Sequence, residues 1–227
     1  MKQLLLFALL LAVISLHGQE SLLIRPTFQG NSLVLGTPYE LANGDTLEIH
    51  KLRFYLSDVQ VFRGEELLSR GVKKHILLDA SKPESLAIIL DRPIKGGADR
   101  IQFLLGVDSL TSVAGATGGD LDPSQGMYWT WQSGYIHFKL EGTASSSKAR
   151  KGRFMYHLGG YEGPYAAQRT ISLSFLSSQS AQINLSIDKW LAGIDIGQTA
   201  QVMSPGKLSS QLADQLASCL DASKKSP

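Results

Sequence analysis

Residues 126–142 read GMYWTWQSGYIHFKLEG and hold two of the chain's three tryptophans, together with a methionine, two tyrosines and a histidine. In an extended strand, successive side chains point to opposite faces of the sheet. One face would carry Met127, Trp129, Trp131, Tyr135 and His137, and the other would carry Tyr128, Thr130, Ile136, Phe138 and Leu140. Neither face is plainly polar, so this strand is expected either to be covered on both sides or to bind a ligand.

The residue types on the first face allow two interpretations. Aromatic and β-branched residues favour strands, and a Trp-rich strand is commonly part of a core. However, thioether, imidazole and indole groups are also the neighbours that a soft cation such as Cu(I) tolerates best. The stretch by itself therefore leaves core packing and metal binding both open.

The first nineteen residues are expected to be a secretory signal peptide. Met1-Lys2 supplies a positive start, residues 4–16 form an apolar run, and residues 16–19 are a plausible cleavage region. The apolar run is too short for a membrane span, and no later segment is apolar enough for one. We therefore expect residues 1–19 to be removed and residues 20–227 to form one exported domain, either periplasmic or secreted.

Composition limits the partners and the means of stabilisation. The 227 residues include 22 Lys and Arg against 20 Asp and Glu, a formal net charge of +2. This balance favours neither nucleic acid nor an anionic membrane as a partner. The single cysteine, Cys219, excludes an internal disulfide, so packing has to stabilise the fold.

Short alternating segments separated by turn signals predict an all-β protein. The longest, residues 46–62, follows the hairpin signal Asn43-Gly44-Asp45 and places His50 on its apolar face. Further strands are expected at residues 22–28, 32–35, 75–79, 86–90, 100–107, 153–158, 170–176 and 182–187.

The connections and the end of the chain complete this picture. Residues 108–126 are expected to form a long Gly-rich loop, and residues 188–191 a turn of helix with Trp190 packed inward. Ser204-Pro205 predicts the start of a C-terminal helix, followed by a frayed tail at residues 223–227. The apolar face of this helix would carry Leu208, Leu212, Leu216, Cys219 and Leu220. The sequence thus predicts an antiparallel β-sandwich with a short C-terminal helix, with a closed barrel as the alternative.

Four histidines follow the expected signal peptide: His50, His75, His137 and His157. No pair has the spacing of a zinc finger or of His-Glu-x-x-His, so a metal site would have to be assembled across strands. His157 has the most suggestive context, because it precedes Gly159-Gly160, where backbone can approach closely. His75 follows two lysines and is expected to be exposed. Each of these histidines could equally be a structural residue with satisfied hydrogen bonds.

Catalytic motifs are not found. The sequence lacks a Gly-x-Ser-x-Gly elbow and a phosphate-binding Gly loop. Asp108, Asp120 and Asp122 around the Gly-rich loop are interpreted as turn-forming residues rather than Ca²⁺ ligands. We therefore predict a binding protein and not an enzyme.

Several motifs resemble those of the MbnP family, exported proteins of bacterial copper handling. They are NGDT at residues 43–46, KLRFYLSDV at 51–59, LGVD at 105–108, LDP at 121–123, the stretch 126–142 and HLGG at 157–160. The resemblance covers nearly the whole chain after residue 19. It implies a periplasmic or surface β-sandwich that binds copper, best as Cu(I).

The resemblance also implies a modified residue and a partner. In characterised relatives a tryptophan is oxidised to kynurenine by a partner dihaem enzyme related to MauG, of the MbnH type, and the product helps histidines to hold the metal. The matching residue is Trp129 or Trp131, and His157 matches a family histidine. Chemistry and strand placement add the other candidates, so the predicted copper ligands are His157, His137, His50, Trp129, Trp131 and Met127.

A second hypothesis is a non-metal β-sandwich module that binds a carbohydrate or a protein partner. Trp129 and Trp131 would then be stacking platforms, so exposed, coplanar indoles would favour a sugar, whereas buried indoles beside a histidine would favour a metal. A third hypothesis, a hydrolase using the Gly-rich loop, is supported by no evident nucleophile or acid–base pair.

Overall fold

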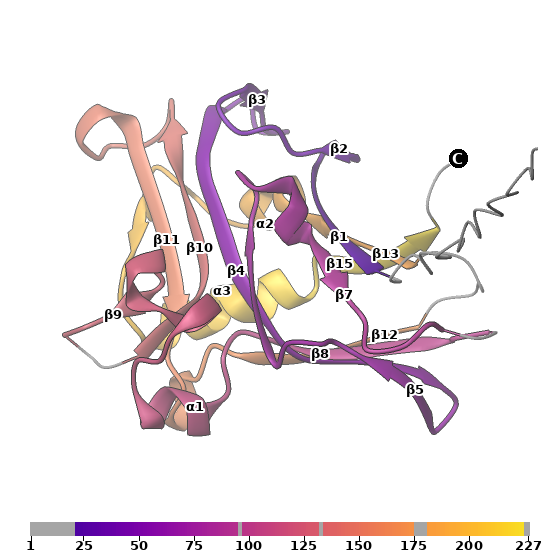
Figure 1. Ribbon diagram of the computed structural model, residues 1–227. Coiled ribbons are helices and arrows are strands. Elements are labelled where there is room, and N and C mark those ends of the chain that lie inside the picture. The colour runs from indigo at the N-terminus through magenta and orange to yellow at the C-terminus, as the bar shows by residue number, and fades with distance from the viewer. Residues whose placement is uncertain (1–20, 95–96, 132–133, 175–180, 225–227) are drawn as a thin grey trace, which may run out of the picture.

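The computed structural model describes residues 21–94, 97–131, 134–174 and 181–224, which form two β-sheets with helices between and beside them (Figure 1). The expected signal peptide, residues 1–19, lies outside the described residues. Within the ranges just given, no helix is both long enough and apolar enough to cross a membrane.

The longest strand, β4 (Thr46–Arg63), is the centre of the larger sheet. One edge of β4 pairs first with β10 (Gly134–Ala144) and then with β8 (Arg100–Leu105). Its other edge pairs with β3 (Pro38–Glu40), β6 (His75–Asp79) and β5 (Glu66–Arg70). The sheet is extended by β12 (Arg169–Ser174) on β8, by β9 (Tyr128–Trp129) and β11 (Arg153–Gly159) on β10, and by β14 (Gln201–Val202) on β11.

The smaller sheet is built on β1 (Ser21–Phe28). This strand pairs with β13 (Ala181–Ser186), β2 (Asn31–Ser32) and β7 (Ala87–Ile89), and β15 (Leu220–Lys224) pairs with β13. The pairs β1–β13 and β11–β14 are parallel, whereas the other described pairs of named strands are antiparallel. The predicted all-β class and sandwich architecture are thus confirmed, with two parallel pairs inside a mostly antiparallel arrangement.

The inner faces of the two sheets share one buried apolar core. Ile24 of the smaller sheet and Leu52 and Leu140 of the larger sheet are each 0% exposed and belong to it. Trp190 packs in the same core, with its ring centroid 5.0 Å from that of Phe138. Burial of this apolar surface is the main stabilising term, as expected for a chain without disulfides.

Helices occupy the connections: α1 (Ser109–Ala114), α2 (Ile187–Ala192), α3 (Lys207–Ala217), and the 3-10 helices η1 (Pro83–Leu86), η2 (Gly119–Leu121), η3 (Pro123–Gln125), η4 (Arg150–Gly152) and η5 (Gly163–Tyr165). The predicted helical turn with an inward Trp190 is confirmed by α2. The C-terminal helix is also confirmed, although Gly206 rather than Ser204 is its N-cap and Leu208 is exposed. It ends at Ala217, so Cys219 lies beyond it and Leu220 begins β15. The frayed tail is wrong in part, because residues up to Lys224 pair with β13 and so satisfy their backbone groups.

Residues 108–126 form a folded cover over the larger sheet rather than an open loop. Asp108 caps α1 by accepting a hydrogen bond from Thr111 N (2.9 Å), and Asp122 caps η3 through Ser124 N (2.8 Å). These contacts support the turn-forming interpretation of both carboxylates. Beneath the cover lies a second apolar cluster of Tyr55, Val107, Leu121, Met127, Trp129, Tyr135 and Ile136.

Two sequence predictions fail because β-sheet alternation is interrupted. Residues 126–142 are not one strand, since Trp129 of β9 pairs with Gly134 of β10 in a hairpin. His50 is not on the apolar face, because it is the extra residue of a β-bulge. Lys51 pairs with Glu141 of β10 and Ile49 pairs with the next residue, Gly142, so His50 has no register partner on β10. An extra residue moves the side chains that follow it to the other face, and the His50 side chain is exposed.

The close packing of β10 yields a test of the fold. A Cβ at Gly142 would clash with the Glu48 carbonyl oxygen and lie 2.6 Å from Phe154 Cζ. We expect Gly142→Ala to lower the free energy of unfolding by about 2–3 kcal/mol. Gly118→Ala is the control, because a Cβ there meets nothing within 4 Å. Urea denaturation followed by tryptophan fluorescence measures both, and equal effects would contradict the strand packing.

Candidate functional site

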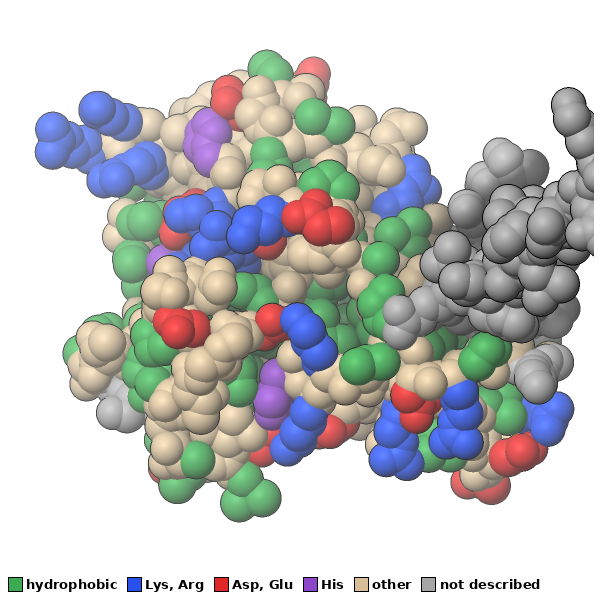
Figure 2. Space-filling view, in the orientation of Figure 1, with side chains coloured by type: hydrophobic (Ala, Val, Ile, Leu, Met, Phe, Trp, Pro, Cys, Tyr) green, Lys and Arg blue, Asp and Glu red, His purple; other side chains and the backbone are tan. Residues whose placement is uncertain are grey.

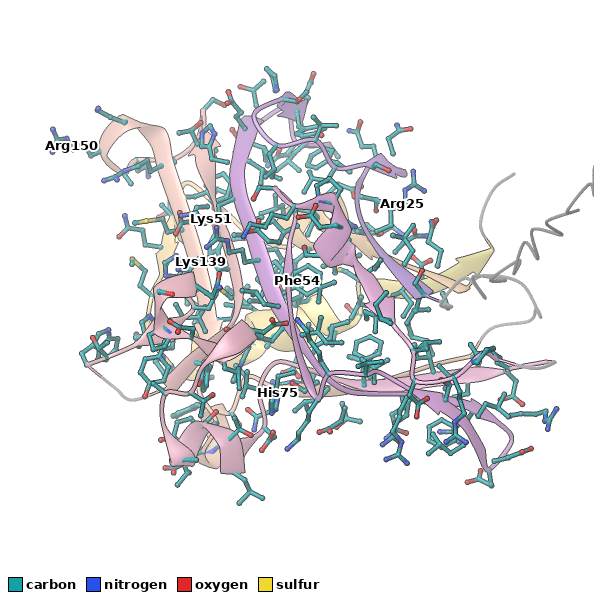
Figure 3. All side chains as sticks on the ribbon, in the orientation of Figure 1. Arg25, Lys51, Phe54, His75, Lys139 and Arg150 are labelled. Carbon is teal, nitrogen blue, oxygen red and sulfur yellow. The ribbon has the colours of Figure 1, made fainter. Side chains whose placement is uncertain are left out.

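The larger sheet presents a polar outer face on the side away from the main core. Its register gives one row of Lys51, Glu141, Met155 and Gln201 across β4, β10, β11 and β14. The next row contains Arg53, Lys139 and His157, while Leu52, Leu140 and Tyr156 point into the core between them. Figure 2 shows basic side chains gathered beside acidic ones over β4 and β10, and Figure 3 labels Lys51 and Lys139 among them.

His157 lies in this face and is held by a carboxylate. Its side chain is 7% exposed, and its Nε2 lies 2.8 Å from Glu141 Oε1. The second carboxylate oxygen, Oε2, accepts a hydrogen bond from Lys51 Nζ at 3.0 Å. The hydrogen bond from His157, together with the nearby Lys51 charge, lowers the pKa of Glu141 to about 2.

The ionised Glu141 fixes the orientation of the His157 ring. A carboxylate only accepts hydrogen bonds, so the Nε2 atom of His157 carries the proton in this contact. In the neutral ring, Nδ1 then presents its lone pair. Metal-binding histidines are typically oriented in this way by a carboxylate on the other ring nitrogen.

The Trp129 indole packs on β11 against Gly159, which lies two residues after His157 and on the same face of that strand. A Cβ at Gly159 would lie only 2.5 Å from Trp129 Cζ3. Only glycine permits this approach. Trp129 is 6% exposed.

Trp131 lies beside Trp129 but at the surface. It is 64% exposed, and the two ring centroids are 5.8 Å apart with an angle of 45° between the ring planes. A cavity of about 250 Å³, lined in part by Trp129, Tyr165 and Pro205, opens next to the pair. The structure thus places Trp129 over Gly159, two residues beyond His157, and beside Trp131, but the indoles are neither coplanar nor both exposed.

His137 lies in the interior, at a bulge where the β10–β11 register shifts between Ile136 and Phe138. Its Nδ1 accepts a hydrogen bond from Val107 N (3.2 Å), and its Nε2 donates to the Gly160 carbonyl oxygen (3.0 Å). Burial lowers the pKa of His137 to about 4. Both ring nitrogens therefore already have backbone partners, and metal ligation would require the loss of one of them.

No hydrogen bond or ion pair joins the other predicted ligands, Met127 and His50, to His157 within the described residues. Met127 is 0% exposed within the second apolar cluster, which also contains Trp129. His50 lies at the surface, with Nδ1 3.3 Å from Glu48 Oε1 and Nε2 3.4 Å from Thr143 Oγ1. In the part of the chain that the structure describes, no group of three or more His, Cys, Asp or Glu side chains is placed to hold a metal ion.

His75, expected to be exposed, is instead largely enclosed. Its side chain is 11% exposed, with Nδ1 2.8 Å from Ser57 Oγ and Nε2 3.2 Å from Thr111 Oγ1. Ser57 is itself fully buried and donates to the Gly106 carbonyl oxygen, so this group links α1 to β4 and offers no accessible nucleophile. Sequence alone could not show this contact, because the partners come from three separate segments.

Sequence reasoning also missed Glu141 and Met155 as neighbours of His157. Met155 was detectable as the residue two positions before His157 on the same strand face. Glu141 was visible within the aromatic stretch, but its pairing with β11 depends on the sheet register.

The environment of His137 predicts a measurable pH dependence. The folded state holds the ring neutral, whereas the unfolded chain takes up a proton below the ordinary pKa of 6.5. Stability contributed by His137 is therefore lost as pH falls from about 6.5 towards about 4. In an NMR titration, we expect the His137 ring signals to stay unchanged until pH approaches 4. A midpoint near 6.5 would contradict the buried, backbone-bonded ring.

Comparison with known proteins agrees with this architecture. A solved structure of MbnP from Methylosinus trichosporium is similar, with a TM-score of 0.56, 14% sequence identity and coverage of 76% of each chain. At this identity the likeness shows the fold alone. No curated protein matches the chain. The sequence model of the MbnP family matches residues 17–204, which is most of the chain. The protein therefore belongs to the MbnP family.

Proposed function

We propose that this protein is an exported copper-binding protein, acting in copper uptake or buffering rather than in catalysis. The observation that carries the proposal is His157, which Glu141 orients and which lies beside the enclosed Trp129. An oriented imidazole next to an aromatic group with little water access suits Cu(I), a soft ion. The expected signal peptide, residues 1–19, would deliver the protein to the periplasm or the exterior.

Trp129 is the better candidate for oxidation to kynurenine. An unmodified indole offers copper only its π face, whereas kynurenine would add an aniline nitrogen and a ketone oxygen next to His157. Trp129 packs over Gly159, beside His157, whereas Trp131 is exposed. A dihaem MauG-like partner enzyme could approach the exposed Trp131 side of the pair.

One observation favours a second candidate function. Trp131 is 64% exposed, and tryptophan is enriched at protein–protein interfaces, so this side chain suits contact with a protein partner. A flat sugar-binding platform is less well supported, because the planes of Trp129 and Trp131 are inclined at 45°. A binding module without copper remains the alternative function.

Copper binding is tested by competition titration with a Cu(I) chelator. We expect micromolar or tighter binding by the wild type and loss of specific binding in His157→Ala. Glu141→Gln keeps the size of the side chain but removes the carboxylate, and should weaken Cu(I) binding about 10- to 100-fold. The control is His50→Ala, which removes an exposed imidazole away from the site and should bind copper as the wild type does. Absence of Cu(I) binding by the wild type would refute the proposal.

Kynurenine formation is tested by intact mass and peptide mapping of protein isolated from its native export compartment. We expect a mass change equal to the gain of one oxygen and the loss of one carbon, located at Trp129. The same map should begin near residue 20 if the signal peptide is removed. Copper-loaded protein with both Trp129 and Trp131 unmodified would contradict the role of kynurenine while leaving copper binding intact.

A further inference from the structure

We propose that Met155 and Met203 complete a soft-metal site around His157, so that a monovalent soft cation binds between an imidazole and two thioethers at the edge of the larger sheet. The inference rests on the proposed function and assigns further ligands at the same site. The proposed ligands take the place of a site built from several histidines. Within the described part of the chain, no three His, Cys, Asp or Glu side chains lie together so that they could hold a metal ion.

The pairing of β11 with β14, continued by one residue beyond β14, brings the three side chains together. The parallel pair β11–β14 aligns Met155 with Gln201 and Tyr156 with Val202. Continued by one residue, the same register aligns His157 with Met203. The chain stays alongside β11 beyond this point, because a Cβ at Gly160 would lie 3.0 Å from Pro205 Cβ.

The burial pattern places Met155, His157 and Met203 on the same, outer face of the larger sheet. Tyr156 and Val202 are buried in the main core, so their neighbours along each strand point to the outer face. Facing strands lie about 4.8 Å apart, and alternate residues of one strand about 6.6 Å apart. Met155 and Met203 therefore flank His157 along and across the sheet, within reach of unbranched, flexible side chains.

The orientation of the imidazole fits this arrangement. Its Nε2 points to Glu141 on β10, so Nδ1 lies on the side of the ring away from Glu141. No hydrogen bond joins this Nδ1 atom to another residue within the described ranges, in contrast to both nitrogens of His137. The Nδ1 lone pair is thus the available donor at the centre of the site.

The neighbouring charges favour a soft, singly charged ion. Lys139 donates to the Gly126 carbonyl oxygen, and Arg53 donates to the Gln125 carbonyl oxygen at 2.7 Å, so both cations are held towards the cover. Arg53 also pairs with Asp79 at 2.8 Å, which leaves Lys139 as the nearer unpaired charge among the described residues. Repulsion of a bound ion by these cations grows with the charge of that ion. Thioether and imidazole ligands select Cu(I) over hard cations such as Ca²⁺ and Mg²⁺.

Exposure provides a route for the ion. His157 is 6% exposed, whereas Met203 is 41% exposed although its side chain is apolar. Met203 would therefore be the first ligand that an incoming ion meets, and His157 the enclosed one. A flexible thioether at the rim also allows the ion to be passed on to a partner.

The test is Cu(I) binding by the full-length exported protein, measured by chelator competition and by X-ray absorption at the copper edge. We expect sulfur in the first coordination shell of the wild type. Met155→Leu/Met203→Leu, which nearly preserves side-chain volume, should remove the sulfur signal and weaken binding at least about tenfold. Met127→Leu is the matched control, because this methionine is fully buried in the second apolar cluster and should leave both readouts unchanged.

Circular dichroism and urea denaturation establish that the double variant is folded, so that loss of binding reports on the ligands. A wild-type copper spectrum without sulfur, or a double variant that binds as tightly as the wild type, would overturn the inference and leave the copper function standing. A wild type that binds no Cu(I) would instead overturn the proposed function together with the site.

Discussion

The pairing of β10 between β4 and β11 is the constraint on which both the core and the candidate site depend. Along β10, Phe138 and Leu140 enter the main core, while Lys139 and Glu141 belong to the outer face. The same backbone therefore fixes the hydrophobic packing and the position of the carboxylate that orients His157. Any slip of this register by one residue would exchange the two faces and destroy both at once.

Two carboxylates pair with the cations of the outer face: Asp79 pairs with Arg53 at 2.8 Å, and Glu141 pairs with Lys51 and His157. Glu141 joins His157 on β11 to Lys51 on β4, and these partners keep its pKa low. Lys139 and Arg53 bond to backbone carbonyl oxygens of the cover formed by residues 108–126. Both cations are thus engaged by backbone oxygens, and the proposed thioether ligands lie on the opposite side of His157, on β11 and beyond β14. The folded cover and the polar face thus stabilise each other.

Much of the fold could be predicted from local pattern, and the failures have a common cause. Alternation and turn signals gave the long strand β4 and the all-β class, because both depend on neighbours in sequence. The exposure of His50 results from a bulge in β4, and the hairpin at Trp129 results from a reversal of the chain. A prediction from alternating side chains treats the strand as regular and continuous, so it misses both features. The surroundings of His157 could not be predicted for the same reason: Trp129 packs over Gly159, two residues beyond His157, and β14 pairs with β11 across a long sequence separation.

The central claim is that Glu141 holds His157 with Nδ1 free to bind Cu(I), and a long-range proton–nitrogen NMR spectrum of the histidine rings tests it most directly. At mildly alkaline pH, the protein should show His157 protonated at Nε2 and unprotonated at Nδ1, and added Cu(I) should shift the Nδ1 signal of His157 while leaving His50 and His137 unchanged. A His157 ring protonated at Nδ1 instead, or a copper-dependent shift confined to His50 or His137, would contradict it.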